Sequence, residues 1–227
     1  MTDIAARLGQ VRARIEEVAR ACGRDPGTIR LVAVSKTHRV EVVRAAAAAG
    51  QREFGENQLQ EALPKIAATS DLGLVWHFIG PLQSNKTRGV AEHFDWVHSI
   101  DRLRIAERLS TQRPAVLPPL QVCIQVNTSG EASKSGVPSA EALALARAVA
   151  TLPRLRLRGV MAIPQPEADA TRQLEACLAV RAVFEQLRTA GLELDTLSLG
   201  MSADLEAAVQ AGSTLLRIGT DIFGARG

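Results

Sequence analysis

The chain has 227 residues, of which 46% are hydrophobic and 22% are charged, and its formal net charge is +3. This composition supports a substantial core and argues against disorder. Nucleic-acid binding would need a basic stripe with stacking aromatic residues, whereas the arginines here are scattered and only 3% of residues are aromatic. The three cysteines are isolated, which disfavours a metal site or a disulfide framework and is consistent with a reducing cytosol.

The first predicted element is an amphipathic helix over residues 2–21, because apolar residues recur there at helical spacing. The segment contains acidic residues and has no continuous apolar run, so it resembles neither a transit peptide nor a signal peptide. We expect it to pack on the folded domain. No apolar stretch of the chain is long enough to cross a membrane, and the expected location is cytoplasmic.

Strand-like and helix-like segments then alternate along the chain. Strands are predicted at 29–36, 52–56, 74–79, 96–100, 119–127, 155–163, 194–199 and 213–218. Helices are predicted at 40–49, 58–69, 86–94, 102–112, 139–151, 168–190 and 203–211. Eight such β/α units favour an α/β fold with a closed (β/α)8 TIM barrel. Little chain remains for an eighth outer helix, and we expect the N-terminal helix to fill that gap.

The domain prediction follows from the same pattern. An open doubly wound sheet would prefer a glycine-rich turn after its first strand, and the segment 35–38, Ser-Lys-Thr-His, is not one. The sequence shows no linker and no second domain. We therefore expect residues 1–227 to form a single barrel domain.

Lys36 ends the apolar run 31–35 and lies at the mouth of a predicted buried strand. Burying an ammonium group is costly unless it is paired or loses its proton, and a partly neutral lysine is suited to Schiff-base chemistry. Lys36 could instead simply extend into water. Lys36, Lys86 and Lys134 are three of only four lysines, and all follow predicted strand ends, where TIM barrels place their active sites.

The loops after the last two predicted strands indicate a phosphate site. TIM barrels frequently bind phosphate there, and Ser202 offers a hydroxyl while Gly219 and Thr220 offer backbone N–H groups. Ser202 could instead only cap the helix that follows, and Gly219 could serve only a tight turn. Two acidic residues in the first turn of that helix would repel a phosphate if they faced it: Asp204 and Glu206.

Arg217 lies inside an apolar strand, so its permanent charge needs a partner. That partner is either a carboxylate such as Glu56 or an acceptor atom of a ligand. A Schiff-base lysine, a phosphate cradle and a buried arginine together fit pyridoxal 5'-phosphate, with its aldehyde on Lys36 and its ring nitrogen at Arg217. A class I aldolase acting on a phosphorylated sugar would use the same parts and remains the alternative at this point.

Seven short motifs extend this pattern along the chain, at residues 31–36, 54–57, 76–83, 133–136, 161–164, 199–202 and 217–220. Together, in this order, they resemble the pyridoxal phosphate homeostasis protein family, also called the YggS/PROSC family. The resemblance implies a single barrel similar to the N-terminal domain of alanine racemase, the fold of the type III pyridoxal phosphate proteins.

The resemblance also implies roles for particular residues. Lys36 would hold the cofactor covalently, Arg217 would face the pyridine nitrogen, and Asn57 would lie near the ring. The residues that would hold the phosphate are Ser202, Gly219 and Thr220. Asn57 could equally cap the helix 58–69, and His77 could flank the ring or be an ordinary core histidine. No catalytic residue and no metal ligand is predicted.

Two features argue against efficient catalysis. An arginine at the ring nitrogen disfavours its protonation and weakens the cofactor as an electron sink. Racemases of related fold use a tyrosine and a second domain of the partner subunit, and this chain has no tyrosine. The expected function is therefore to hold pyridoxal phosphate and release it to apo-enzymes that depend on it, with Lys86 and Lys134 as candidates for cofactor exchange. The alternative is a slow amino-acid racemase or decarboxylase, and the expected oligomeric state is a monomer or a weak homodimer.

Overall fold

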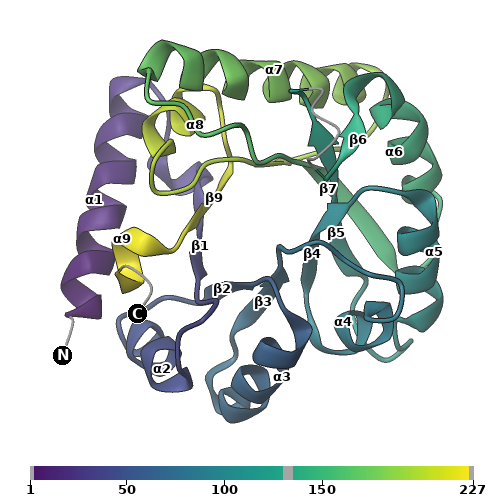
Figure 1. Ribbon diagram of the computed structural model, residues 1–227, viewed down its shortest axis with the longest axis horizontal. Helices are drawn as coiled ribbons and strands as arrows, with labels where there is room; N and C mark the ends of the chain where they lie inside the picture. Colours follow the sequence, from purple (N-terminus) through teal and green to yellow (C-terminus); the bar gives the residue numbers. More distant parts are fainter. Residues whose placement is uncertain (1–2, 130–134, 225–227) are drawn as a thin grey trace.

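A closed ring of parallel strands forms the centre of the molecule (Figure 1). The computed structural model describes residues 3–129 and 135–224. Within them, eight strands pair in chain order, and the ring closes because β1 pairs with β9 and β4 with β5. The barrel strands are β1 (Arg30–Val34), β2 (Glu53–Glu56), β3 (Val75–Phe78), β4 (Trp96–Ile100), β5 (Leu120–Asn127), β7 (Leu155–Met161), β8 (Thr196–Ser198) and β9 (Leu215–Ile218).

Helices cover the outside of this barrel. They are α1 (Ile4–Ala21), α2 (Val40–Ala48), α3 (Leu59–Ala68), α4 (Thr87–His93), α5 (Leu103–Gln112), α6 (Ala142–Ala150), α7 (Ala170–Thr189), α8 (Leu205–Gln210) and α9 (Thr220–Phe223). Short 3-10 turns lie at η1 (Pro26–Thr28), η2 (Ser70–Leu72) and η3 (Ser139–Glu141). The predicted (β/α)8 barrel is confirmed, and the part of the chain that the structure describes contains no helix long and apolar enough to span a membrane.

Most differences from the predicted elements lie at their ends, and the short elements η1, η2, β6 and α9 were not predicted. β1 ends at Val34, so Lys36 lies two residues beyond the strand. β6 (Val137–Pro138) lies between the predicted strand 119–127 and the predicted helix 139–151, and it pairs in parallel with the end of β5. The helix predicted from residue 139 begins with the 3-10 turn η3 before α6.

The N-terminal helix α1 occupies the place of an eighth outer helix. It packs against α2, α8 and α9, and Figure 1 shows it running beside the short α9 near the chain end. The side chain of Asp3 caps its first turn by accepting from the backbone N–H of Ala6. Its buried apolar face is formed by Leu8, Val11, Ile15 and Ala19. This packing brings α1 close to the loops that follow β8 and β9.

The two faces of the strands bury different kinds of side chain, because successive residues of a strand point to opposite sides. The main hydrophobic core lies between the strands and the helices and includes Phe54 and Leu216. A separate small cluster of Trp96, Cys123 and Met161 lies apart from this core, and buried polar side chains such as His77 and His98 contact Trp96. Near the amino ends of the strands, two guanidinium groups contact the Trp96 ring, that of Arg30 at 4.5 Å and that of Arg158 at 5.0 Å from the ring centroid.

Candidate functional site

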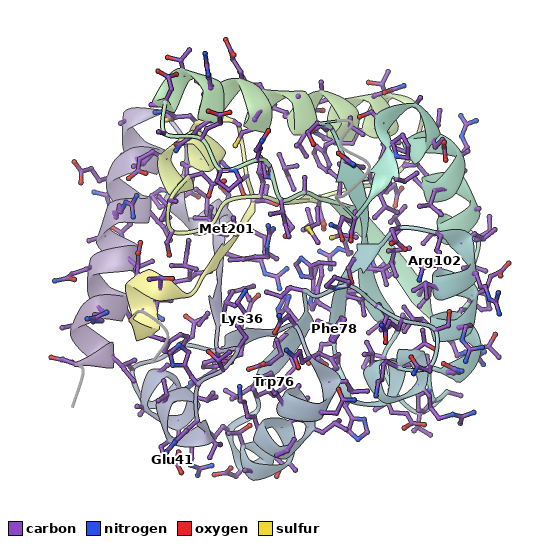
Figure 2. All side chains as sticks on the ribbon, in the orientation of Figure 1. Lys36, Glu41, Trp76, Phe78, Arg102 and Met201 are labelled. Carbon is purple, nitrogen blue, oxygen red and sulfur yellow. The ribbon has the colours of Figure 1, made fainter. Side chains whose placement is uncertain are left out.

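A cavity of about 370 Å³ opens at the carboxyl ends of the strands. Its lining includes all six residues predicted to contact a cofactor, namely Lys36, Asn57, Ser202, Arg217, Gly219 and Thr220. Apolar side chains complete the wall, among them Val34, Ile79 and Met201. Figure 2 labels Met201 above Lys36 near the centre of the view. The volume falls in the range of small-molecule sites, which are mostly apolar with a few placed polar groups.

Lys36 is half-buried and is followed by a sharp change of backbone direction. Thr37 has a φ of 68°, a left-handed conformation that is rare for a β-branched residue. The backbone N–H of Thr37 donates to Glu61 Oε2 of α3 at 3.2 Å, which helps to hold this turn. Such conformations cost energy and cluster at functional sites. The turn leaves Lys36 at the rim of the cavity while the chain continues to α2.

A buried ion pair supports the backbone just before Lys36. Lys65 Nζ lies 2.7 Å from Glu56 Oε1 and donates to the carbonyl oxygen of Ser35 at 2.9 Å, while Ser35 Oγ donates to Glu56 Oε1 at 2.7 Å. Burial raises the pKa of Glu56, although its hydrogen bonds from Lys65 and Ser35 act in the opposite direction. The prediction of Glu56 as a carboxylate partner for Arg217 is therefore wrong. Its side chain lies on the outer face of β2, whereas that of Arg217 lies in the barrel interior.

Arg217 is 4% exposed and is held by neutral acceptors. Nη1 donates to Ser198 Oγ at 2.6 Å, and Nη2 donates to the carbonyl oxygen of Ala162 at 2.9 Å. Burial lowers the pKa of Arg217 to about 10, so the guanidinium keeps its charge at neutral pH. These contacts use two of its five N–H donors, and others remain for an acceptor in the cavity.

Ser202, Gly219 and Thr220 form one corner of the cavity, between the ends of β8 and β9. Ser202 does not cap α8, because that helix begins at Leu205 after Asp204; instead its Oγ accepts from the backbone N–H of Asp221 at 3.3 Å. A Cβ added at Gly219 would lie 3.2 Å from the carbonyl oxygen of Val34. Glycine therefore allows the loop after β9 to approach β1 closely.

Arg14 of α1 neutralises two carboxylates behind this corner. Its Nη2 lies 2.6 Å from Glu206 Oε2, its Nε also contacts Glu206, and its Nη1 lies 2.9 Å from Asp221 Oδ2. Both terminal nitrogens also lie 3.4 Å from the carbonyl oxygen of Ser202. The other acidic residue of concern, Asp204, accepts from the backbone N–H of Met201 at 2.7 Å. Glu206 and Asp204, the acidic residues expected to repel a phosphate, thus both accept hydrogen bonds within the protein, which reduces their repulsion of a phosphate in this corner.

Asn57 lies in the cavity wall and not at a helix cap. α3 begins at Leu59 after Gln58, and that end of the helix has no side-chain cap. A Cβ added at Gly80 would lie 2.3 Å from the carbonyl oxygen of Asn57, so the loops after β2 and β3 are in close contact. The reading of Asn57 as a cap for α3 is therefore wrong.

The remaining candidate residues lie elsewhere. His77 is fully buried, and its Nδ1 lies 2.9 Å from His98 Nε2 inside the barrel, which agrees with the core-histidine reading. Lys86 is half-buried at the start of α4 and is not part of the cavity lining. Lys134 lies outside the described residues. Among the described side chains, no group of His, Cys, Asp and Glu could hold a metal ion.

Sequence reasoning missed Arg14, Lys65 and Ser198. Arg14 and Glu206 are separated by 192 positions, and no periodicity in the sequence links them. The pairing of Lys65 with Glu56 could have been predicted from one feature of the sequence. Lys65 lies nine positions after this carboxylate at a strand end, within the helix that covers that strand. Ser198 lies at the end of a short apolar strand, where a serine is unremarkable in the sequence.

Comparison with known proteins agrees with this geometry. Residues 6–227 match the family model described as "Alanine racemase, N-terminal domain". The chain is 61% identical to the pyridoxal phosphate homeostasis protein of Pseudomonas aeruginosa, with 100% of this chain and 97% of that protein covered. It is 59% identical to the protein of the same name from Escherichia coli K12, with 100% and 98% covered.

Solved structures are similar over the same length. PipY of Synechococcus elongatus, solved with pyridoxal phosphate bound, has a TM-score of 0.86 and 37% identity, covering 97% of this chain and 100% of that one. Alanine racemase from Corynebacterium glutamicum has a TM-score of 0.71 and 18% identity, covering 98% of this chain and 60% of that one, which shows a shared fold. The chain belongs to the pyridoxal phosphate homeostasis protein family and has the fold of the alanine racemase N-terminal domain.

Proposed function

We propose that this protein binds pyridoxal 5'-phosphate as a Schiff base on Lys36 and serves in cofactor homeostasis, holding the cofactor and releasing it. One observation carries the proposal: a lysine, a buried arginine and a polar corner, taken from three separate parts of the chain, line a single cavity. The relatives named for pyridoxal phosphate homeostasis and the cofactor-bound PipY support the same ligand.

The residues present fit this cofactor. Pyridoxal phosphate supplies an aldehyde that condenses with an amine and a ring that can stabilise negative charge. Lys36 provides the amine at the rim, and Arg217 provides N–H donors for the ring nitrogen from the cavity floor. Ser202, Gly219 and Thr220 would hold the phosphate, with Asn57 near the ring. Apolar residues of the wall would exclude water from the ring.

Holding rather than catalysis is favoured by the groups around the cavity. Arg217 keeps its charge and offers only donors, so it opposes protonation of a ring nitrogen that faces it. The described residues of the cavity lining include no carboxylate, histidine, cysteine or tyrosine to move a proton on the far side of the ring. We therefore infer a cofactor carrier, located in the cytoplasm as a monomer or weak homodimer, whose recipients are apo-enzymes that depend on pyridoxal phosphate.

The test is an absorbance titration of the purified protein with pyridoxal phosphate. A visible band should form in the wild type and in Lys86→Ala, and should be absent in Lys36→Ala. Borohydride reduction followed by peptide mass spectrometry should locate the added mass on Lys36. A protein that forms no band would refute the cofactor assignment, and trapping that requires a sugar phosphate would instead support an aldolase.

Two further measurements separate carrier from enzyme. Loaded protein should restore activity to an apo-enzyme that depends on pyridoxal phosphate, and Lys134→Ala or Lys86→Ala should slow this transfer if either lysine assists exchange. A panel of amino acids should give no turnover. Racemisation or decarboxylation that disappears in Lys36→Ala would favour the slow-enzyme alternative.

A further inference from the structure

A row of buried polar side chains runs through the barrel interior and ends at Arg217. Arg217 Nη1 lies 2.6 Å from Ser198 Oγ, which lies 2.8 Å from His98 Nδ1. His98 Nε2 lies 2.9 Å from His77 Nδ1, and His77 Nε2 lies 3.1 Å from Glu53 Oε2. These residues come from β9, β8, β4, β3 and β2, so the row crosses the lumen between β8 and β4.

Four of the five members of this row are buried, and the surroundings of each member decide its charge. Ser198, His98 and His77 are fully buried, and Glu53 is half-buried. Burial lowers the pKa of His77 and lowers that of His98 strongly, so both rings are neutral at neutral pH. Glu53 is ionised, because its contacts with His77 and Arg30 lower its pKa despite partial burial. The row therefore joins one anion to one cation through three neutral groups.

The charges at the two ends favour one direction for the protons of the row. His77 Nε2 lies 3.1 Å from the ionised Glu53 without hydrogen-bond geometry, and the negative charge there favours the tautomer with its proton on Nε2, which leaves Nδ1 to accept. His98 Nε2 then carries a proton, and His98 Nδ1 accepts from the hydroxyl of Ser198. That hydroxyl oxygen is left to accept from Arg217, which can only donate. These roles agree with one another, and they form the proton arrangement that the charges of Glu53 and Arg217 favour.

We propose that Ser198 and His98 are positioning residues that aim the Arg217 guanidinium at the ring nitrogen of a pyridine-containing ligand in the cavity. Neither Ser198 nor His98 lines the cavity, so their effect on a ligand must pass through Arg217. The hydroxyl oxygen of Ser198 accepts a hydrogen bond from Arg217 Nη1, and the carbonyl oxygen of Ala162 accepts one from Nη2. Together these two hydrogen bonds fix the plane of the guanidinium. His98 turns the Ser198 hydroxyl so that its oxygen faces Arg217. The ligand part of this inference rests on the proposed function.

The first experiment needs no ligand. In protein labelled with nitrogen-15, the guanidinium of Arg217 should rotate slowly in the wild type, because two acceptors hold it. Rotation should become at least about tenfold faster in Ser198→Ala and in His98→Leu, and Ser198→Thr, which keeps the hydroxyl, should restore slow rotation. The matched control is Ser213→Ala, because Ser213 is an equally buried serine whose hydroxyl contacts only backbone carbonyl oxygens.

The second experiment uses pyridoxal phosphate labelled with nitrogen-15 in its ring. Ser198→Ala and His98→Leu should shift the ring-nitrogen resonance and weaken binding about tenfold, whereas Ser198→Thr and Ser213→Ala should match the wild type. A wild-type resonance and affinity in Ser198→Ala, or the same changes in Ser213→Ala, would overturn the positioning role.

The two experiments separate the two ideas. A wild-type protein that binds no pyridoxal phosphate refutes the proposed function, and with it the ligand part of this inference. The rotation measurement still decides whether Ser198 and His98 hold Arg217. If Ser198→Ala does not fold, the comparison of His98→Leu with Ser198→Thr decides the same question.

Discussion

Replacing Lys65 by methionine removes the charged partner of a fully buried carboxylate beside the site. Glu56 is 0% exposed, and Lys65 Nζ lies 2.7 Å from its Oε1. Lys65 is itself 7% exposed, so water cannot take its place easily. Methionine has a similar length and is apolar, so the change mainly deletes the charge and its two hydrogen bonds. The backbone of Ser35, which precedes Lys36, loses one of those bonds.

The expected loss of stability is large. Breaking a buried ion pair on one side typically costs about 3–5 kcal/mol, because the remaining charge is left without compensation. The double variant Lys65→Met with Glu56→Gln removes both charges and keeps an oxygen that can accept from Ser35 Oγ. Since removal of a whole buried pair is often close to neutral, we expect the double variant to recover more than half of the loss.

The loss should also depend on pH in a defined direction. Burial raises the pKa of Glu56 in the folded protein, so the folded state binds this proton more tightly than the unfolded state. Stability therefore falls as pH rises from the ordinary carboxyl pKa through the folded pKa. Without Lys65 the folded pKa rises further. The variant should lose most at alkaline pH, and least at acidic pH, where Glu56 is protonated in both states.

Urea unfolding followed by tryptophan fluorescence measures this effect, because Trp76 and Trp96 are both buried. The free energy of unfolding is compared at about pH 5 and about pH 8 for the wild type, Lys65→Met and the double variant. Lys86→Met, which removes a half-buried lysine, is the control for loss of a lysine as such. An equal loss at both pH values, or a loss no greater than that of Lys86→Met, would refute the reasoning.

Three further outcomes are expected. Arg14→Ala leaves the carboxylates of Glu206 and Asp221 without their cation near the proposed phosphate corner. In a titration, binding of pyridoxal phosphate should therefore weaken about tenfold, while binding of unphosphorylated pyridoxal should stay unchanged. Equal weakening of both ligands would contradict this explanation. Gly80→Ala places a Cβ 2.3 Å from the carbonyl oxygen of Asn57, so the free energy of unfolding in urea should fall by about 2 kcal/mol or more. A variant as stable as the wild type would show that the two loops can move apart at little cost. Its control, Gly9→Ala, meets nothing within 4 Å inside α1 and should gain up to about 1 kcal/mol. A thiol-specific disulfide reagent should modify the exposed Cys22 rapidly in the native protein and all three thiols in urea. Burial raises the pKa of Cys123 and Cys177 to about 12, so these two thiols should react slowly in the native protein. Rapid reaction of a second thiol in the native protein would contradict their burial.

Much of the fold follows from local patterns in the sequence. Apolar runs alternate with amphipathic segments at a spacing that only a β/α repeat satisfies, and the ends of parallel strands meet at one face of a barrel. That rule alone brings Lys36 and Arg217 together, although they are far apart in the chain. It also brings Ser202, Gly219 and Thr220 to the same cavity.

The hydrogen-bond partners of the site residues were harder to predict than the positions of these residues in the fold. The pairing of Glu56 with Arg217 is wrong because it ignores which face of its strand each side chain occupies at the strand end. The capping roles considered for Asn57 and Ser202 are also wrong, because α3 and α8 begin one or more residues later than the sequence pattern indicates. A shift of that size is common at helix ends and is enough to change the role of a capping residue.

The sequence by itself determined the repeat, the barrel and the set of residues at its open end, since these depend on periodicity and on the order of strands along the chain. Only the tertiary structure decided which groups hold those residues. Arg14 meets Glu206 across 192 positions, and His98 meets Ser198 across 100. Such contacts arise because closure of the barrel brings distant strands and the first helix together. Short-range sequence patterns do not predict which side chains meet after that closure. The chemistry of Arg217 therefore depends on a row of residues that becomes visible only once the barrel is closed.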